Sequence, residues 1–281
     1  IMPRLVGSEM CIRDSVCIIL ILLIEMKREK KILSKEVISW AFYDWANSAF
    51  ATTVMAGFFP LFFKSFWASN LTDAESTGML GIANSLSGLL IVLIAPFLGA
   101  VADITFKKKY LLVFFMIIGT GSTASFFLIQ QGDWILAMTA YIFACIGFSG
   151  GNIFYDSLII NVSSEQSRNK VSAFGYAMGY LGGGLLFVLN VFMYLQPAVF
   201  GLASQVDAIL FSFLSVAVWW SFFTLPLIRY VKEKSGLFEK TSSINLIKKS
   251  FFRVVQTFRE IREYKNLFYF LIAYWLYMDG I

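Results

Sequence analysis

Histidine is absent from the 281-residue sequence, and cysteine is scarce. Without histidine there can be no imidazole proton relay and no Ser-His-Asp nucleophile, and most zinc sites are excluded as well. Of the three cysteines, Cys11 and Cys17 lie in N-terminal segments that are interpreted below as an artefact and as doubtful read-through. Only Cys145 is then assigned to the native protein, so no disulfide framework is expected.

The sequence is instead rich in long apolar runs. Hydrophobic residues make up 58% of the chain, aromatic residues 17% and charged residues 15%, and the mean hydropathy is +0.71. A soluble domain is only about 45–50% apolar. Runs of about 20 apolar residues can cross a bilayer as helices. The sequence predicts six such spans, near 37–65, 78–102, 110–130, 134–160, 171–195 and 206–229, and the start of a seventh at 267.

The first 25 residues are expected to lie outside the folded unit. Residues 1–15 are interpreted as a sequencing artefact, because residues 5–15 read as a translated transposase adapter, and residues 16–25 as doubtful read-through before Met26. The competing interpretation is a signal peptide, but no small-residue cleavage site follows the apolar stretch. The remaining units are expected to be a six-span half at 26–230, a cytoplasmic loop at 231–266 and a truncated seventh span at 267–281. We therefore expect a fragment of a longer protein.

Basic residues collect in alternate loops. Of the 23 Lys and Arg residues, two lie in the first fifteen residues, and twenty of the other 21 fall on one side of the predicted spans, Lys64 being the exception. The positive-inside rule then places the N-terminus in the cytoplasm. The net charge of +5 reflects this topology, so the expected partner is a lipid bilayer and not a nucleic acid.

The predicted loop at 231–266 contains an amphipathic pattern. Apolar residues recur there at three- and four-residue spacing, at Ile244, Ile247, Phe251, Val255 and Phe258. This pattern favours a helix on the cytoplasmic membrane face. The alternative is a soluble tether that packs against the bundle.

Acidic residues lie inside the hydrophobic runs, and two have the same setting. Asp44 in the first span and Asp156 in the fourth each follow a Phe-Tyr pair. A carboxylate at the bilayer centre costs about 2.5–3.5 kcal/mol, so such residues persist mainly where they face a wet cavity and have a function. The seventh span contains a third acid, Asp279. Spans one, four and seven would be equivalent members of three-helix repeats, the pattern by which many transporters build their binding site.

Polar neighbours accompany these acids. Asp44, Ser48 and Thr52 lie on one stripe of the first span. Asp44, Asp156 and Asp279 are predicted to accept protons or to bind an ammonium group, and hydrogen bonds are predicted from Tyr43, Asn47, Asn152 and Tyr155. The structural alternative is that each acid pairs with a cytoplasmic lysine or caps a helix end. Nearby Trp40 and Trp45 are interpreted as interface anchors.

The segment between the second and third spans carries a motif. Gly99, Asp103, Lys107 and Lys108 match the Gly-x-x-x-Asp-Arg-x-Gly-Arg-Lys-Lys signature of the major facilitator superfamily, although Ile104 and Phe106 replace its Arg and second Gly. This resemblance implies that the four matching residues form a gating loop. It also implies that the Asp103 carboxylate interacts with the N-terminal dipole of a helix in a C-terminal half of the same chain. That C-terminal half is an expected partner of the six predicted spans.

A narrower resemblance covers residues 34–281. The sequence from Trp40 to Phe50, the Asn-Ile-Phe-Tyr-Asp run at 152–156 and the pair Asp279-Gly280 are similar to the vacuolar-effluxer branch of that superfamily. The resemblance implies the six-helix N-terminal half of a major facilitator fold. It also implies export of amino acids from the vacuole in fungi, whereas bacterial members mostly lack an assigned substrate.

Small residues recur every four positions in the fifth span, at Gly175, Gly179 and Gly183. Such spacing allows close helix packing in lipid. The run also resembles an antiporter signature of the superfamily, but Tyr180 replaces its proline.

The leading hypothesis is a secondary active transporter that moves a small polar solute by alternating access. Proton coupling is a further hypothesis, motivated by the buried acids alone. A membrane-embedded enzyme would need clustered acids or an activated nucleophile, and no paired metal-binding carboxylates occur within one loop. A scaffold or sensor would need no acids in the membrane interior. A channel would need a re-entrant filter segment, and none stands out between the predicted spans. We therefore expect no enzyme activity, cofactor or metal. The expected location is a bacterial inner membrane.

Overall fold

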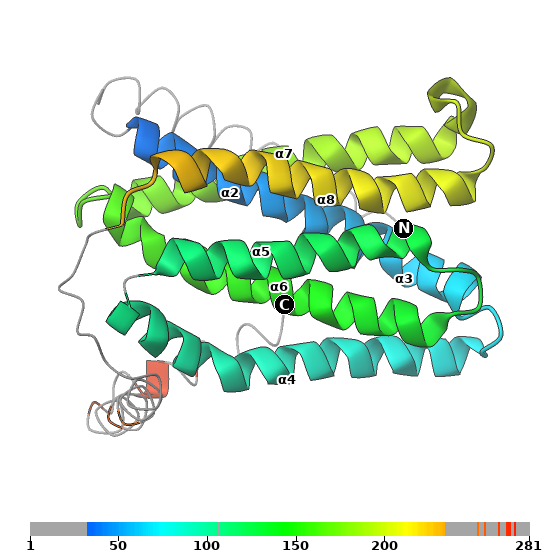
Figure 1. Cartoon of the computed structure of the whole chain (residues 1–281), viewed down its shortest axis with the longest axis horizontal. Coiled ribbons are helices and arrows are strands. Elements are labelled where there is room, and N and C mark those ends of the chain that lie inside the picture. Colours follow the sequence, from blue (N-terminus) through cyan, green and yellow to red (C-terminus); the bar gives the residue numbers. More distant parts are fainter. Residues whose placement is uncertain are drawn as a thin grey trace, which may run out of the picture.

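The computed structural model describes residues 33–105 and 107–233, together with isolated positions between 252 and 273 (Figure 1). The predicted N-terminal artefact, the amphipathic helix of the 231–266 loop and the truncated seventh span lie outside the two continuously described ranges. These three expectations therefore stay predictions.

Six helices in the described ranges are long and apolar enough to cross a membrane. The first runs through Lys35–Trp67 and is built from α2 (Lys35–Ala49), η1 (Phe50–Phe58), α3 (Phe59–Phe62) and η2 (Phe63–Trp67). The others are α4 (Asp73–Thr105), α5 (Lys108–Ser125), α6 (Trp134–Val162), α7 (Arg168–Leu195) and α8 (Gln205–Tyr230). Each corresponds to a predicted span with small shifts of its ends, so the all-α polytopic fold is confirmed.

The first span is widened along much of its length. Its segments η1 and η2 have π-helical hydrogen bonding, which the apolar pattern does not predict. The Thr52 hydroxyl donates to the Ser48 carbonyl oxygen and also lies 3.1 Å from the Gly183 carbonyl oxygen on α7. Farther along, Pro60 lacks the N–H that a regular helix would use. Both features disturb the regular hydrogen-bond ladder, and π turns occur frequently at functional sites.

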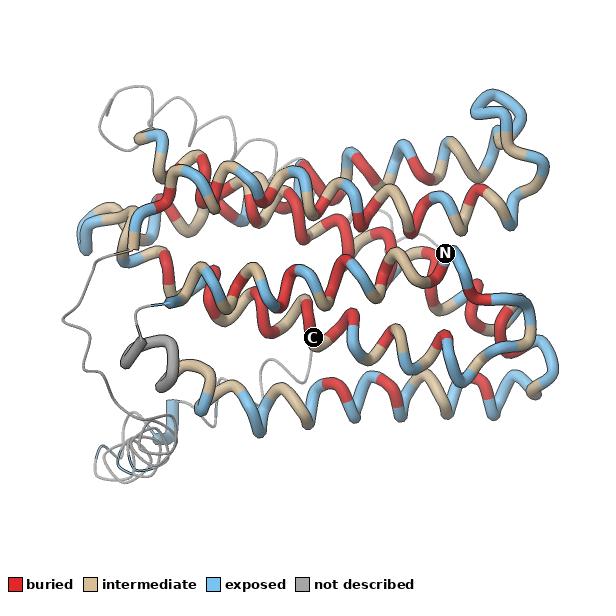
Figure 2. The backbone as a smooth tube through the Cα atoms, in the orientation of Figure 1, coloured by how far each residue is buried: buried red, intermediate tan, exposed pale blue. Residues whose placement is uncertain are grey.

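The helices pack as two groups of three. The first span packs on α7 and α8, whereas α6 packs on α5 and α4 (Figure 1). An aromatic cluster fills one end of the bundle, where Phe59 stacks on Tyr141 at 4.0 Å between ring centroids and Trp67 packs on Phe126 and Phe213. Helix α4 lies at the edge and keeps most of its surface exposed (Figure 2).

The motif between the second and third spans is more helical than predicted. Helix α4 continues to Thr105, three residues beyond the predicted end of the second span at 102, so Asp103 lies in the helix together with Gly99. Lys107 is the N-cap residue of α5, and Lys108 is its first residue. The gating role that the resemblance implies for these four residues stays a prediction.

Candidate functional site

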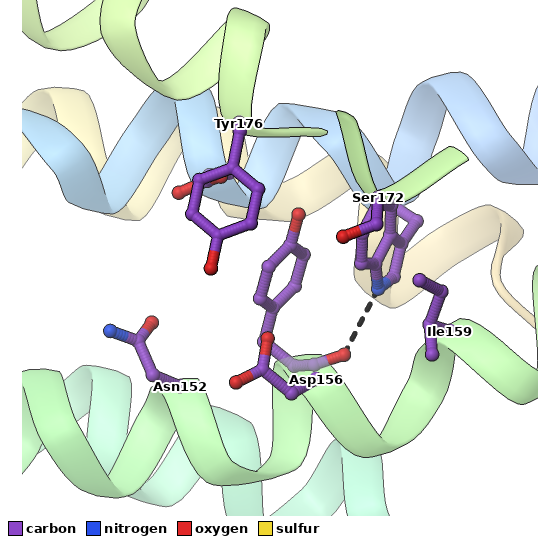
Figure 3. A pocket seen from close by; sticks show the side chains of 8 residues that line it. Asn152, Asp156, Ile159, Ser172 and Tyr176 are labelled. Atoms are coloured by element: carbon purple, nitrogen blue, oxygen red, sulfur yellow. Dashed lines mark hydrogen bonds between the residues drawn. The ribbon is translucent and has the colours of Figure 1, made fainter. Parts of the chain in front are cut away.

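A cavity of about 370 Å³ lies between α2, α6 and α7 (Figure 3). It is lined by Trp40, Asp44, Asn152, Tyr155, Asp156, Ile159, Ser172 and Tyr176. The first and fourth spans thus bring Asp44 and Asp156 to the wall of one cavity, although 112 positions separate them in the sequence.

The two carboxylates have different surroundings. Asp44 is half-buried and accepts a hydrogen bond from the Ser48 hydroxyl at 3.0 Å, one helical turn away. Asp156 is more exposed, and Figure 3 shows its side chain among Asn152, Ile159 and Tyr176. The cavity lining includes no lysine or arginine. Two acids without a basic residue in the wall create a site that favours a cation.

Aromatic rings form a second part of the wall. The Trp40 and Tyr155 rings stack with centroids 4.3 Å apart, and the Trp40 indole N–H donates to the Tyr155 carbonyl oxygen at 3.0 Å (Figure 3). Tyr43 lies against Tyr155 at 5.1 Å between centroids. Trp40 is only 2% exposed, so its interpretation as an interface anchor was wrong. Trp45 also packs inward, stacked on Trp219 of α8.

An amide pair connects the first and fourth spans beside the acids. The Asn47 side-chain N–H donates to the Asn152 side-chain oxygen. Within the described part of the chain, the Asn47 side-chain oxygen and the hydroxyls of Tyr43 and Tyr155 are buried without a hydrogen-bond partner. Buried polar atoms normally have partners. Of these three residues only Tyr155 lines the cavity, so the solute contacts expected of Tyr43 and Asn47 stay predictions.

The glycines of the fifth span lie against the first span. A Cβ at Gly175 would lie 2.7 Å from the Trp40 ring, and one at Gly179 would lie 2.8 Å from the Asp44 carboxyl carbon. At Gly183 it would lie 2.9 Å from the Ser48 carbonyl oxygen. This close approach of α7 to α2 places Ser172 and Tyr176 in the cavity wall.

The structure leaves some predicted site residues apart from the cavity. Gly99 lies in α4, where a Cβ would meet nothing within 4 Å. Lys107 and Lys108 lie at the start of α5, next to Lys109, whose ammonium donates to the Val231 carbonyl oxygen at 2.7 Å. Asp103 lies in α4, and Asp279 lies outside the described residues.

Besides Trp40, three lining residues were not anticipated from the sequence. Ile159 follows Asp156 by three positions, so helical spacing could have placed it on the same face. Ser172 and Tyr176 are four apart on the face of α7 that carries Gly175 and Gly179. That spacing was a usable signal, but only packing against α2 shows that this face borders the cavity.

The described spans have the fold of a six-helix half of a major facilitator superfamily transporter. The chain is similar to the inward-open structure of the xylose transporter XylE from E. coli, with a TM-score of 0.50 and 17% identity. The similarity covers 83% of this chain and 55% of that one. At this identity the match establishes the fold and carries no information on substrate.

The chain belongs to the family of vacuole effluxer Atg22-like proteins, whose family model matches residues 71–160 and 160–281. It is 37% identical over 258 residues to the uncharacterized MFS-type transporter YxiO of Bacillus subtilis, covering 89% of this chain. It is 22% identical over 304 residues to autophagy-related protein 22 of Eremothecium gossypii, covering 90% of this chain. In both comparisons the chain spans 58% of the relative's length.

Proposed function

We propose that this protein is a secondary active transporter and that the α2–α6–α7 cavity binds the ammonium group of a small polar solute. The observation that carries the proposal is the pairing of Asp44 and Asp156 in a cavity wall without a basic residue. Both acids lie within membrane-length helices, where an unpaired carboxylate is costly and usually functional.

The chemistry of the wall supports an ammonium-bearing solute. The two carboxylates can neutralise its charge, and Trp40, Tyr155 and Tyr176 supply aromatic surface that can attract a cation. Asn152 and Ser172 can hydrogen-bond other polar groups. Amino acids are one such class of solute, and the sequence resemblance implies their export by fungal members of the family.

The charge of the site suggests how a transport cycle would run. When no solute is bound, a proton on Asp44 or Asp156 would reduce the cost of exposing a carboxylate to a low-dielectric wall. Proton uptake could therefore alternate with solute binding as the cavity opens to each side in turn. In this scheme the N-terminus lies in the cytoplasm, as the distribution of basic residues predicts.

The test is counterflow in proteoliposomes. Vesicles containing the purified protein are loaded with unlabelled leucine, lysine or putrescine, and uptake of the same labelled solute is followed, with glutamate as the anionic comparison. We expect accumulation of at least one ammonium-bearing solute and loss of that accumulation in Asp44→Asn and Asp156→Asn. Unchanged counterflow in both variants would overturn the proposed role of the acids.

A matched variant separates local chemistry from damage to the fold. Asp133 is an acid at the start of α6 that does not line the cavity. Asp133→Asn should therefore leave counterflow unchanged. Equal loss in this variant would show that the assay reports folding and not the site.

A further inference from the structure

The charges in the wall of the α2–α6–α7 cavity restrict the charge of a matching solute. Among the described residues, those that line the cavity include Asp44 and Asp156 but no lysine or arginine. Arg168 and Lys170 belong to the first turn of α7, just before the lining residue Ser172, and neither lines the cavity. When both acids are ionised, the wall therefore carries two negative charges that no basic residue of the wall neutralises.

Solutes that carry an ammonium group differ in how they neutralise these charges. A neutral amino acid has one ammonium and one carboxylate group, so it leaves the charge of the site unchanged and adds a group that the acids repel. A monoamine neutralises one acid only. A diamine without a carboxylate neutralises both, and like charges that share a site strongly disfavour each other. The charge of the wall therefore matches a diamine best.

The two acids are placed so that each can receive one end of a linear solute. Asp44 is on α2, in the span that packs on α7 and α8, whereas Asp156 is on α6, which packs on α5 and α4. The Ser48 hydroxyl donates to the Asp44 carboxylate at 3.0 Å and so restrains it. The two carboxylates thus approach the cavity from different helices, and a solute that contacts both connects the two groups of helices.

The remainder of the wall suits the carbon chain of such a solute. Ile159 is aliphatic, the Tyr176 residue is 66% exposed, and Figure 3 shows both side chains near Asp156. Apolar surface favours contact with methylene groups, and aromatic rings also attract cations. The cavity volume of about 370 Å³ lies in the range of small-molecule sites, so a short diamine can enter.

We propose that the α2–α6–α7 cavity selects linear aliphatic diamines over amino acids. This inference rests on the proposed function and narrows it from ammonium-bearing solutes in general to dications without a carboxylate. One ammonium group binds Asp44, the other binds Asp156, and the methylene chain lies against Ile159 and Tyr176. An amino acid would need a basic group for its carboxylate, and the cavity wall within the described spans supplies none.

Three solutes with matched carbon chains test the two features of the proposal. Putrescine has two ammonium groups, n-butylamine has one on a chain of the same length, and ornithine is putrescine with a carboxylate added. Isothermal titration calorimetry measures their binding to the purified protein in detergent. We expect putrescine to bind at least about tenfold more tightly than either of the others, roughly the effect of one hydrogen bond to a charged group.

A variant that removes one charge tests the role of the second acid. In Asp156→Asn only Asp44 stays charged, so putrescine should bind no more tightly than n-butylamine apart from the statistical advantage of its two equivalent ends. Asp133→Asn removes a carboxylate at the start of α6 that does not line the cavity, and it should keep the preference of the unmodified protein.

Each outcome decides between the alternatives. If ornithine binds as tightly as putrescine, the site accepts a carboxylate and the inference is overturned. Equal binding of n-butylamine and putrescine to the unmodified protein, or no binding of any of the three, overturns it as well. In these cases counterflow of an ammonium-bearing solute that is lost in Asp44→Asn and Asp156→Asn would leave the proposed function standing. If Asp156→Asn does not fold, the three solutes with the unmodified protein decide.

Discussion

The indole N–H of Trp40 donates to the carbonyl oxygen of Tyr155 at 3.0 Å, and the rings of the same two residues stack with their centroids 4.3 Å apart. This double contact joins the first span to the fourth directly beside Asp44 and Asp156. It orients both helices so that the acids line one cavity. Substitutions at this junction, and where α7 approaches it closely, should therefore affect both stability and transport.

Removal of the Trp40 hydrogen bond should destabilise the bundle modestly. Trp40→Phe keeps an aromatic ring against Tyr155 but loses the donor, so we expect the free energy of unfolding to fall by about 1 kcal/mol. The matched control is Trp45→Phe, because the Trp45 indole nitrogen has no partner within the described residues. Denaturant unfolding in detergent compares the two, and an equal loss in both would contradict the assigned role of the hydrogen bond.

The amides of Asn47 and Asn152 should be energetically coupled. Either single change to leucine leaves the other amide without its partner, whereas the double change removes both polar groups. We expect a coupling energy of about 0.6 kcal/mol and at most roughly 1.7 kcal/mol, the range for hydrogen bonds between membrane helices. Unfolding of the two single variants and the double variant measures this energy, and strictly additive losses would count against the coupling.

Gly179 should not tolerate a methyl group, whereas Gly184 should. A Cβ at Gly179 would lie 2.7 Å from the Ser48 hydroxyl and 2.8 Å from the Asp44 carboxyl carbon, while one at Gly184 would meet nothing within 4 Å. Gly179→Ala should therefore cost about 1–3 kcal/mol of stability through overpacking. Gly184→Ala should be neutral or stabilising by up to about 1 kcal/mol, since alanine favours the helix.

The same pair tests the site. If α7 holds Asp44 in position, Gly179→Ala should also reduce counterflow, and Gly184→Ala should not. A destabilised Gly179→Ala protein that keeps full counterflow would show that the contact is structural only.

Neutralising Asp44 should separate stability from function. An asparagine keeps an oxygen that can accept from Ser48 but removes a charge from a wall without a basic residue. At a pH where the carboxylate is charged, we expect Asp44→Asn to raise stability by about 1 kcal/mol while counterflow is lost. Asp73→Asn, at the exposed start of α4, should instead lose a few tenths of a kcal/mol of helix-dipole stabilisation. A fall in stability of Asp44→Asn would indicate that the acid is structural.

Much of the fold could be predicted because span formation is a local property. Each apolar run is long enough to cross a bilayer, and a helix is the only structure that satisfies its backbone internally in a single segment. The exact ends were less predictable. Helix α4 continues to Thr105, three residues beyond the predicted end of the second span at 102.

The site was predictable in part. Asp44 and Asp156 could be identified from the sequence alone, because a carboxylate in an apolar run is costly whatever the packing around it. Trp40 was misassigned, since a tryptophan near a span end can face either the interface or a neighbouring helix, and only the contact with Tyr155 distinguishes the two.

The sequence by itself determined that this is a membrane protein with six spans in its described part, which residues are charged within those spans, and which family it belongs to. These features depend on the length and composition of single segments. Tertiary structure alone decided that Asp44 and Asp156 share a cavity, that Trp40 lies in its wall, and that α7 contributes Ser172 and Tyr176. Each of these depends on how one helix is rotated and how closely another approaches it, and the α2–α7 distance is set by glycines meeting side chains more than a hundred positions away.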